Sequence, residues 1–393
     1  MTKDVWVVGA TRTAIGTYGS ALKDIPPTAL ASLVTAEALR RSGLPAERVE
    51  HVVFGSVVYG ESRDVYLSRV AAIDAGLSVG TPCLTVNRLC GSGLQAIVSA
   101  AQHLMLGDHA CAIAGGAESM SRAAYILPSA RWGQRMGDAP VVDAMTAALH
   151  DPFGHGHMGI TAENIAERYG IGRDAQDAYA VESHRRAAHA LTEGYFKEQI
   201  VPVALKSRKG PTEFVTDEHV RPGATLADMA KLRPAFKKDG TVTAGNASGL
   251  NDGAAAVVLM EAEAARAAGA KPLARLVGYA HAAVDPQMMG LGPTPAVRRV
   301  FEKTGLRVSD MDVIESNEAF AVQAMAVARD LEFDPLKVNP NGGAVALGHP
   351  IGATGSILTV KALYELARIG GRYALVTMCI GGGQGIAAIF ERA

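Results

Sequence analysis

The chain has 393 residues, of which 48% are hydrophobic and 20% are charged, and its formal net charge is −1. This composition predicts a globular protein with a large core and two or more compact units, and the absence of long Lys/Arg runs argues against nucleic-acid binding. The sequence holds neither an apolar stretch of about 18 residues nor a signal-peptide pattern, so we expect no membrane span and no export.

The cysteine spacing fits neither paired C-x-x-C ligands nor a zinc finger, so we expect no metal site; the four are Cys83, Cys90, Cys111 and Cys379. Free thiols in a large chain favour a reducing cytoplasm. The glycine-rich opening from Gly9 to Gly19 does not predict a dinucleotide site. It lacks the G-x-G-x-x-G spacing, and no acidic residue ends a following strand about 20 residues later.

Cys90 lies in a turn at residues 86–93, where a short β-type run gives way to a helix predicted from Leu94. The partial positive charge at a helix N-terminus favours thiolate and should lower the thiol pKa from its free value of about 8.5. Gly91 and Gly93 permit a sharp turn that presents the sulfur. The alternative is a buried cysteine that only fills space, as most free cysteines do. Cys90 by itself leaves both interpretations open.

Between residues 121 and 245 the pattern changes to charged helices and extended pieces. The clearest helix runs from Arg173 to Glu193, with three charged side chains predicted to be exposed: Glu182, Arg185 and Arg186. An insertion this long and organised is usually functional, although a decorative or oligomerisation role is the alternative. The basic patch at 206–209 favours a solvated hairpin tip over a site for a small phosphorylated ligand.

The two ends of the chain share one plan, in which a β-type run precedes a glycine-rich turn, a helix and a second β-type run. The runs are 52–56 and 110–116 around the Cys90 turn, and 312–316 and 374–378 around a turn at His349. This alternation predicts α/β units whose strands are covered by helices on both faces. Ligands of such sheets gather at the carboxyl ends of strands, so Cys90 and Cys379 should meet at one edge.

Three polar residues of the second half stand at turns. His349 has an ordinary pKa near 6.5, at which an imidazole can accept a thiol proton and return it, although a structural histidine is the common alternative. Glycines surround Cys379, which predicts a loop and not a core position. Asn317 follows a β-type run and could equally cap a helix.

Four blocks, in this order, resemble those of the thiolases: Asn87-Arg88-Leu89-Cys90-Gly91-Ser92-Gly93, Asn317-Glu318-Ala319-Phe320, Gly348-His349-Pro350-Ile351-Gly352-Ala353-Thr354-Gly355 and Cys379-Ile380-Gly381-Gly382-Gly383. The resemblance covers essentially the whole chain. Its closest similarity is to bacterial biosynthetic β-ketothiolases of broad chain-length tolerance, a type associated with polyhydroxyalkanoate synthesis and fatty acid metabolism.

The resemblance implies an α/β thiolase fold with a duplicated five-layered αβαβα core. Residues 1–120, completed by 246–270, would form the N-terminal half, and 271–393 the C-terminal half. Residues 121–245 would be a loop domain that covers coenzyme A. The family also implies a homodimer or homotetramer, acetyl-CoA and 3-ketoacyl-CoA as substrates, and no permanently bound cofactor.

The resemblance further implies roles in acyl transfer. Cys90 would attack a thioester and hold the acyl group, while His349 takes its proton. Cys379 would remove the α-proton of a second acetyl-CoA, or activate the coenzyme A thiol in the thiolytic direction. The amides of Cys90 and Gly381 would form one oxyanion hole, and Asn317, through a bound water, would form the second with His349.

The coenzyme A contacts that the resemblance implies are Leu149, His157, Met158, Arg221, Phe236, Ala244, Ser248, Ala319 and Phe320. Arg221 suits the nucleotide end, and the apolar residues suit a narrow pantetheine channel. Asp228 stands where relatives have a small polar residue, which puts that contact in doubt. Met158 and Met289 resemble acyl-pocket residues whose flexibility would tolerate several chain lengths.

Three other functions compete with a biosynthetic thiolase. A degradative 3-ketoacyl-CoA thiolase shares the reaction centre and differs in acyl pocket and direction. A ketosynthase would pair its cysteine with two histidines, whereas this chain has Asn317 and Cys379 in those roles. A coenzyme A or lipid-binding protein without turnover is disfavoured because Cys90, His349 and Cys379 are all present.

Overall fold

The computed structural model describes residues 3–206 and 210–393. Most of the basic patch at 206–209 therefore lies outside the described residues, between the paired strands β8 (Val203–Leu205) and β9 (Thr212–Phe214). Within the described residues, no helix combines the length and the apolar character that a membrane crossing requires.

Five strands form the N-terminal half of the main sheet. In spatial order they are β1 (Val5–Arg12), β10 (Asn251–Glu261), β5 (Cys111–Ser119), β3 (His51–Gly55) and β4 (Cys83–Val86). The first three are antiparallel to their neighbours, whereas β5, β3 and β4 run parallel. A short strand, β2 (Gly16–Thr17), pairs with the start of β10.

The C-terminal half repeats this order and these directions. Its strands are β11 (Ala274–Ala283), β14 (Gln384–Arg392), β13 (Tyr373–Ile380) and β12 (Val313–Ser316), and Val338 bridges Ile314 where the first half has β4. Antiparallel pairs are again followed by a parallel one. The predicted duplication is therefore confirmed.

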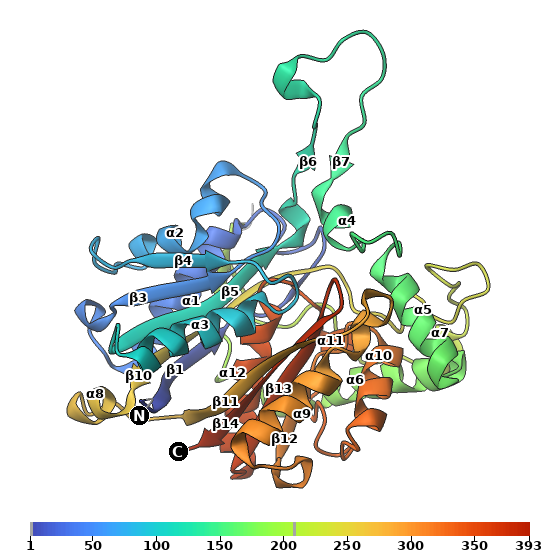
Figure 1. Ribbon diagram of the computed structural model, residues 1–393. Coiled ribbons are helices and arrows are strands. Elements are labelled where there is room, and N and C mark those ends of the chain that lie inside the picture. The colour runs from blue at the N-terminus through green and yellow to red at the C-terminus, as the bar shows by residue number, and fades with distance from the viewer. Residues whose placement is uncertain (1–2, 207–209) are drawn as a thin grey trace.

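Helices form the other layers of the core (Figure 1). Helices α3 (Ser92–Leu106) and α12 (Thr354–Ile369) contact each other and strands of both halves, so they lie between them. Helices α1 (Pro27–Ser42) and α2 (Leu67–Asp74) pack on the N-terminal half. Helices α9 (Pro293–Thr304) and α10 (Ala321–Asp330) pack on the C-terminal half. The predicted five-layered arrangement is confirmed.

The sequence did not predict that the halves also join edge to edge, through pairing of Trp6 with Arg275 and of Val7 with Ala274.

Two glycines let the N-termini of the central helices touch. A Cβ on Gly93 would lie 2.8 Å from the Ser356 nitrogen, and a Cβ on Gly355 would lie 2.3 Å from the Leu94 nitrogen. Any side chain at either position would push the helices apart. Because the Cys90 turn precedes α3 and the His349 turn precedes α12, this crossing brings the two turns together.

The segment between β5 and β10 supplies the remaining elements. A two-stranded arm, β6 (Tyr125–Ile126) and β7 (Val142–Asp143), projects from the body in Figure 1 and leads into α4 (Ala144–Ala148). Helices α5 (Met158–Tyr169), α6 (Arg173–Glu193) and α7 (Leu226–Met229) follow. Short helices α8 (Ala262–Ala267) and α11 (Ala344–Leu347) connect strands elsewhere.

Helix α6 has the predicted bounds, but its predicted exposed face is only partly correct. Arg185 is exposed, whereas Glu182 and Arg186 are half-buried. Glu182 pairs with both arginines, and Arg186 reaches the carbonyls of Val338 and Pro335. Arg186 therefore ties helix α6 to the C-terminal half of the chain.

Candidate active site

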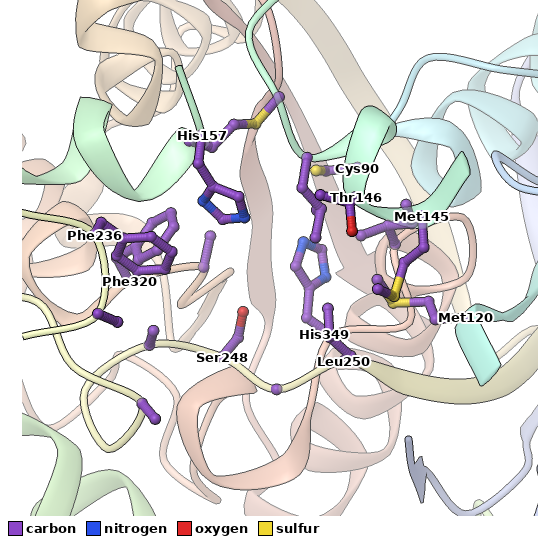
Figure 2. Close-up of a pocket in the computed structure, with 18 of the residues that line it drawn as sticks. Cys90, Met120, Met145, Thr146, His157, Phe236, Ser248, Leu250, Phe320 and His349 are labelled. Carbon is purple, nitrogen blue, oxygen red and sulfur yellow. The ribbon is translucent and has the colours of Figure 1, made fainter. Parts of the chain in front are cut away.

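A pocket of about 480 Å³ opens where the two central helices begin. Cys90, His349 and Cys379 all line it, although they come from three distant parts of the chain. Figure 2 shows the imidazole of His349 directed toward Cys90, on the side of the pocket opposite Phe236 and Phe320. The predicted meeting of the two cysteines at one edge of the sheets is thereby observed.

Cys90 sits in a tight turn between β4 and α3. Leu89 has a φ of 45°, a left-handed conformation that is uncommon for a residue with a side chain. The Ser92 hydroxyl holds the turn, because it accepts from the Arg88 amide at 2.9 Å and donates to the Leu89 carbonyl at 2.6 Å. Helix α3 begins at Ser92, two residues before the predicted start.

The predicted lowering of the Cys90 pKa is wrong. Burial raises the pKa of the Cys90 thiol to about 11, although the backbone amides of Gly381 and of Cys90 itself act to lower it. The cost of burying a thiolate at Cys90 therefore outweighs the stabilisation that the N-terminus of α3 could give it. At pH 7 Cys90 is therefore a thiol, and a base would be needed to make it a thiolate.

His349 is buried, and its hydrogen bonds fix which ring nitrogen carries the proton. Its Nδ1 lies 2.6 Å from the Thr354 hydroxyl, which itself donates to the Pro350 carbonyl at 2.9 Å. Because that hydroxyl hydrogen is committed to Pro350, Nδ1 donates to the Thr354 oxygen, and Nε2 carries the lone pair that accepts from the Asn317 side chain. Nε2 lies 3.4 Å from the Asn317 side-chain nitrogen.

The expectation that His349 titrates near neutrality is also wrong. Burial lowers the pKa of His349 to about 4, so the imidazole is neutral at pH 7. A neutral ring with an unprotonated Nε2 can accept a proton there. The backbone N–H of His349 donates to Asn251 Oδ1 at 2.9 Å, which anchors the turn to β10.

Asn317 is fully buried at the end of β12, and it is not a helix cap. Helix α10 begins at Ala321 with Phe320 at its cap position, so the capping alternative is wrong. The Asn317 amide N–H donates to the Thr377 carbonyl of β13 at 3.0 Å. Asn317 does not itself line the pocket, and its side-chain Oδ1 is buried without a hydrogen-bond partner among the described residues.

Cys379 lies inside strand β13, paired with Gly385, and it is 1% exposed. The predicted loop position is therefore wrong, because the glycine run begins only after the strand ends. Burial and the nearby Cys90 thiol both raise the pKa of Cys379 well above its ordinary value. Gly381 follows the strand, and a Cβ there would lie 2.3 Å from the Met158 methyl carbon.

All nine predicted coenzyme A contacts line the same pocket as Cys90, His349 and Cys379; the nine are Leu149, His157, Met158, Arg221, Phe236, Ala244, Ser248, Ala319 and Phe320. The rings of His157 and Phe236 stack with centroids 4.6 Å apart, and Phe320 meets Phe236 edge-on. Met289 lines the pocket as well. Asp228 does not; it is exposed and bonds to Thr225 and Lys231.

Sequence reasoning missed several lining residues, among them Met120, Met145, Thr146, His219, Leu250 and Ile351. One signal was available. Asp143 caps α4 by accepting from the Met145 amide. An Asp before a helical run predicts a helix start, and Met145 and Thr146 of that first turn line the pocket. The other positions show no local pattern.

Residues 5–263 match the N-terminal domain of thiolases, and residues 270–392 match the thiolase C-terminal domain. The chain belongs to the thiolase family. It is therefore an acyltransferase. It is 64% identical to the beta-ketothiolase BktB of Cupriavidus necator, with both chains covered completely. An acetyl-CoA acetyltransferase of Pseudomonas aeruginosa is 50% identical over 99% of this chain and all of its own.

Solved structures of thiolases agree with this fold. Human mitochondrial 3-ketoacyl-CoA thiolase is 44% identical, with a TM-score of 0.98 over 100% of this chain and 99% of its own. The acetyl-CoA acetyltransferase of Syntrophomonas wolfei is 41% identical, with a TM-score of 0.98 and complete coverage of both chains.

Proposed function

We propose that this thiolase is an acetyl-CoA C-acyltransferase, a β-ketothiolase that reversibly condenses acetyl-CoA with acetyl-CoA or a short acyl-CoA. The convergence of Cys90, His349 and Cys379 on one pocket is the observation that carries the proposal. The names of the similar proteins, beta-ketothiolase and acetyl-CoA acetyltransferase, support condensation over a binding role without turnover.

In the first half-reaction Cys90 takes the acyl group. His349 Nε2 accepts the Cys90 proton as the sulfur attacks the thioester carbonyl. The carbon–sulfur bond to coenzyme A then breaks, and His349 returns the proton to the leaving thiolate. The raised pKa of the Cys90 thiol makes this base necessary, and the lowered pKa of His349 keeps the base neutral beforehand.

In the second half-reaction Cys379 acts as the base. Its buried thiol first passes a proton to neutral His349, the acceptor in the same pocket. The Cys379 thiolate then removes the α-proton of a second acetyl-CoA, and the resulting carbanion attacks the acyl carbon on Cys90. The Cys90 thiolate leaves and recovers a proton from His349, so the centre returns to its starting state.

Two oxyanion sites would stabilise these steps. The amides of Cys90 and Gly381, which already act on the Cys90 sulfur, would bind the oxygen of the tetrahedral intermediate. Asn317 and protonated His349 would face the enolate oxygen. The unpartnered Asn317 Oδ1 supports a water as the intermediary, because a buried carbonyl oxygen needs a donor.

We assign residues 121–245 as the loop domain that covers coenzyme A, between the N-terminal half, 1–120 with 246–270, and the C-terminal half, 271–393. In support, six of the nine proposed coenzyme A contacts come from this segment: Leu149, His157, Met158, Arg221, Phe236 and Ala244.

We also propose a homo-oligomer, a tetramer built from dimers. The projecting arm exposes large apolar side chains: Tyr125 is 70% exposed, Trp132 is 91% exposed, and Met136 is fully exposed. Apolar side chains gathered on a projection fit a second copy of the chain. We further propose that the enzyme works in the cytoplasm, which its four free thiols favour, and supplies polyhydroxyalkanoate synthesis.

Acetyl-CoA alone tests the central step. After incubation and digestion, mass spectrometry should find an added acetyl group on the peptide that contains Cys90 and none in the Cys90→Ser variant. An acetyl group on another residue, or none in folded protein that binds coenzyme A, would reject Cys90 as the acyl carrier.

Chain length separates the biosynthetic proposal from a degradative thiolase. Met158 and Met289 line the pocket, and their flexible side chains favour tolerance of several short chains. We therefore expect thiolysis of four- and five-carbon 3-ketoacyl-CoA to exceed that of ten-carbon and longer substrates. The opposite ranking would favour the degradative alternative.

A further inference from the structure

Glu118 is a fully buried carboxyl group at the end of β5, outside the pocket lining. Its partners are three backbone amides: Val57 at 3.1 Å, Val58 at 3.2 Å and Gly352 at 2.9 Å. The first two belong to the N-terminal half, and Gly352 belongs to the His349 turn. One side chain therefore joins the two halves beside the reactive residues.

The same contacts reach Cys90 through packing. Val57, Val58 and Ile351 form one apolar cluster with Met120, and Cys90 packs against it. The fit around Glu118 is tight, since a Cβ on Gly352 would lie 2.5 Å from the carboxylate and a Cβ on Gly116 would lie 2.3 Å from the Gly352 oxygen. A substitution at Glu118 should therefore shift the apolar cluster against which Cys90 packs.

We propose that Glu118 is a positioning residue that sets the His349 turn against Cys90. This role of Glu118 rests on the proposed function of Cys90 as the acyl carrier.

The electrostatics agree with this geometry. Burial raises the pKa of Glu118 to about 8, against the lowering effect of its three amide donors, and Asp252 adds to the rise. Burial is the main cause of the raised pKa of the Cys90 thiol and of Tyr59, and the Glu118 charge adds to both rises. Glu118 should therefore be neutral below pH 7 and charged at pH 9.

Alkylation of Cys90 by iodoacetamide, followed by mass spectrometry of its peptide, tests the charge. In Glu118→Gln we expect the rate at pH 9 to rise about threefold or more, because the opposing charge is gone, and the rate at pH 6.5 to stay within about twofold. A rise at both pH values would indicate loosened packing and would overturn the charge role, as would unchanged rates.

Two further variants separate position from charge. Glu118→Asp keeps the charge but cannot span the same amides, so the acetylation rate of Cys90 should fall about tenfold while KM for acetyl-CoA stays within about twofold. A rate within twofold of wild type in folded Glu118→Asp overturns the positioning role. Glu315→Gln is the matched control. Glu315 is also a fully buried carboxyl group, but it lies in the C-terminal half, where it accepts a hydrogen bond from Lys361. It should not change Cys90 alkylation at pH 9 relative to pH 6.5.

The alkylation outcomes do not depend on which residue carries the acyl group. Acetylation at a residue other than Cys90 in the wild-type enzyme would reject the proposed function, whereas alkylation rates report only on the thiol.

Discussion

Replacing Thr354 by Val tests how the fold orients His349 for its proposed role as a base. The Thr354 hydroxyl accepts the Nδ1–H bond of His349 at 2.6 Å and donates to the Pro350 carbonyl at 2.9 Å. Valine keeps the branched shape and removes both bonds. The Pro350 oxygen also accepts from the backbone amides of residues 353 and 354, so the turn itself should persist.

The expected magnitude follows from the lost partner. A buried donor left unpaired costs about 1–3 kcal/mol. The imidazole avoids that cost by moving its proton to Nε2, which then cannot accept from Cys90. Since about 1.4 kcal/mol corresponds to a tenfold change in an equilibrium, we expect kcat for acetoacetyl-CoA thiolysis to fall about 10- to 100-fold. KM should stay within about twofold, because Thr354 does not line the pocket.

Steady-state thiolysis and single-turnover acetylation of Cys90 provide the assay. Thr354→Ser restores the hydroxyl and should recover most of the rate. Thr359→Val is the matched control, since Thr359 is buried in the same helix and donates to the Gly355 carbonyl at 2.9 Å. The reasoning is refuted if Thr354→Val folds and acetylates Cys90 within twofold of the wild-type rate, or if Thr359→Val loses as much.

Three further outcomes are expected. Because burial lowers the pKa of His349 to about 4, the acid limb of Cys90 acetylation should lie below pH 5, and the unfolded state's proton uptake should lower stability as pH falls from about 6.5 to 4; a limb near pH 6.5 would contradict this. Arg12→Met leaves the buried Asp217 without its bidentate partner at 2.7 and 2.9 Å, so the free energy of unfolding should fall by about 3–5 kcal/mol in a denaturant titration, and a loss under 1 kcal/mol would refute the role of the pair. Replacing Trp132 and Met136 together by Asp should convert tetramers to dimers in light scattering, whereas an unchanged mass would remove the arm from the interface.

The sequence alone predicted much of this protein because Cys90 and His349 stand in glycine-rich turns between regular elements. The alternation of β-type runs and helices around Cys90 and His349 predicted the duplicated core. The bounds of α6 followed from its periodicity. These features depend on residues close together in the chain, so a local pattern carries them.

Only the tertiary structure decided the ionisation states and the neighbours of the reactive groups. The pKa values of Cys90 and His349 depend on burial by segments hundreds of residues away, and this desolvation outweighs the local helix terminus. Cys379 likewise entered a strand because Gly385 pairs with it across the sheet. Burial and strand pairing are properties of the folded arrangement, so no local pattern could report them.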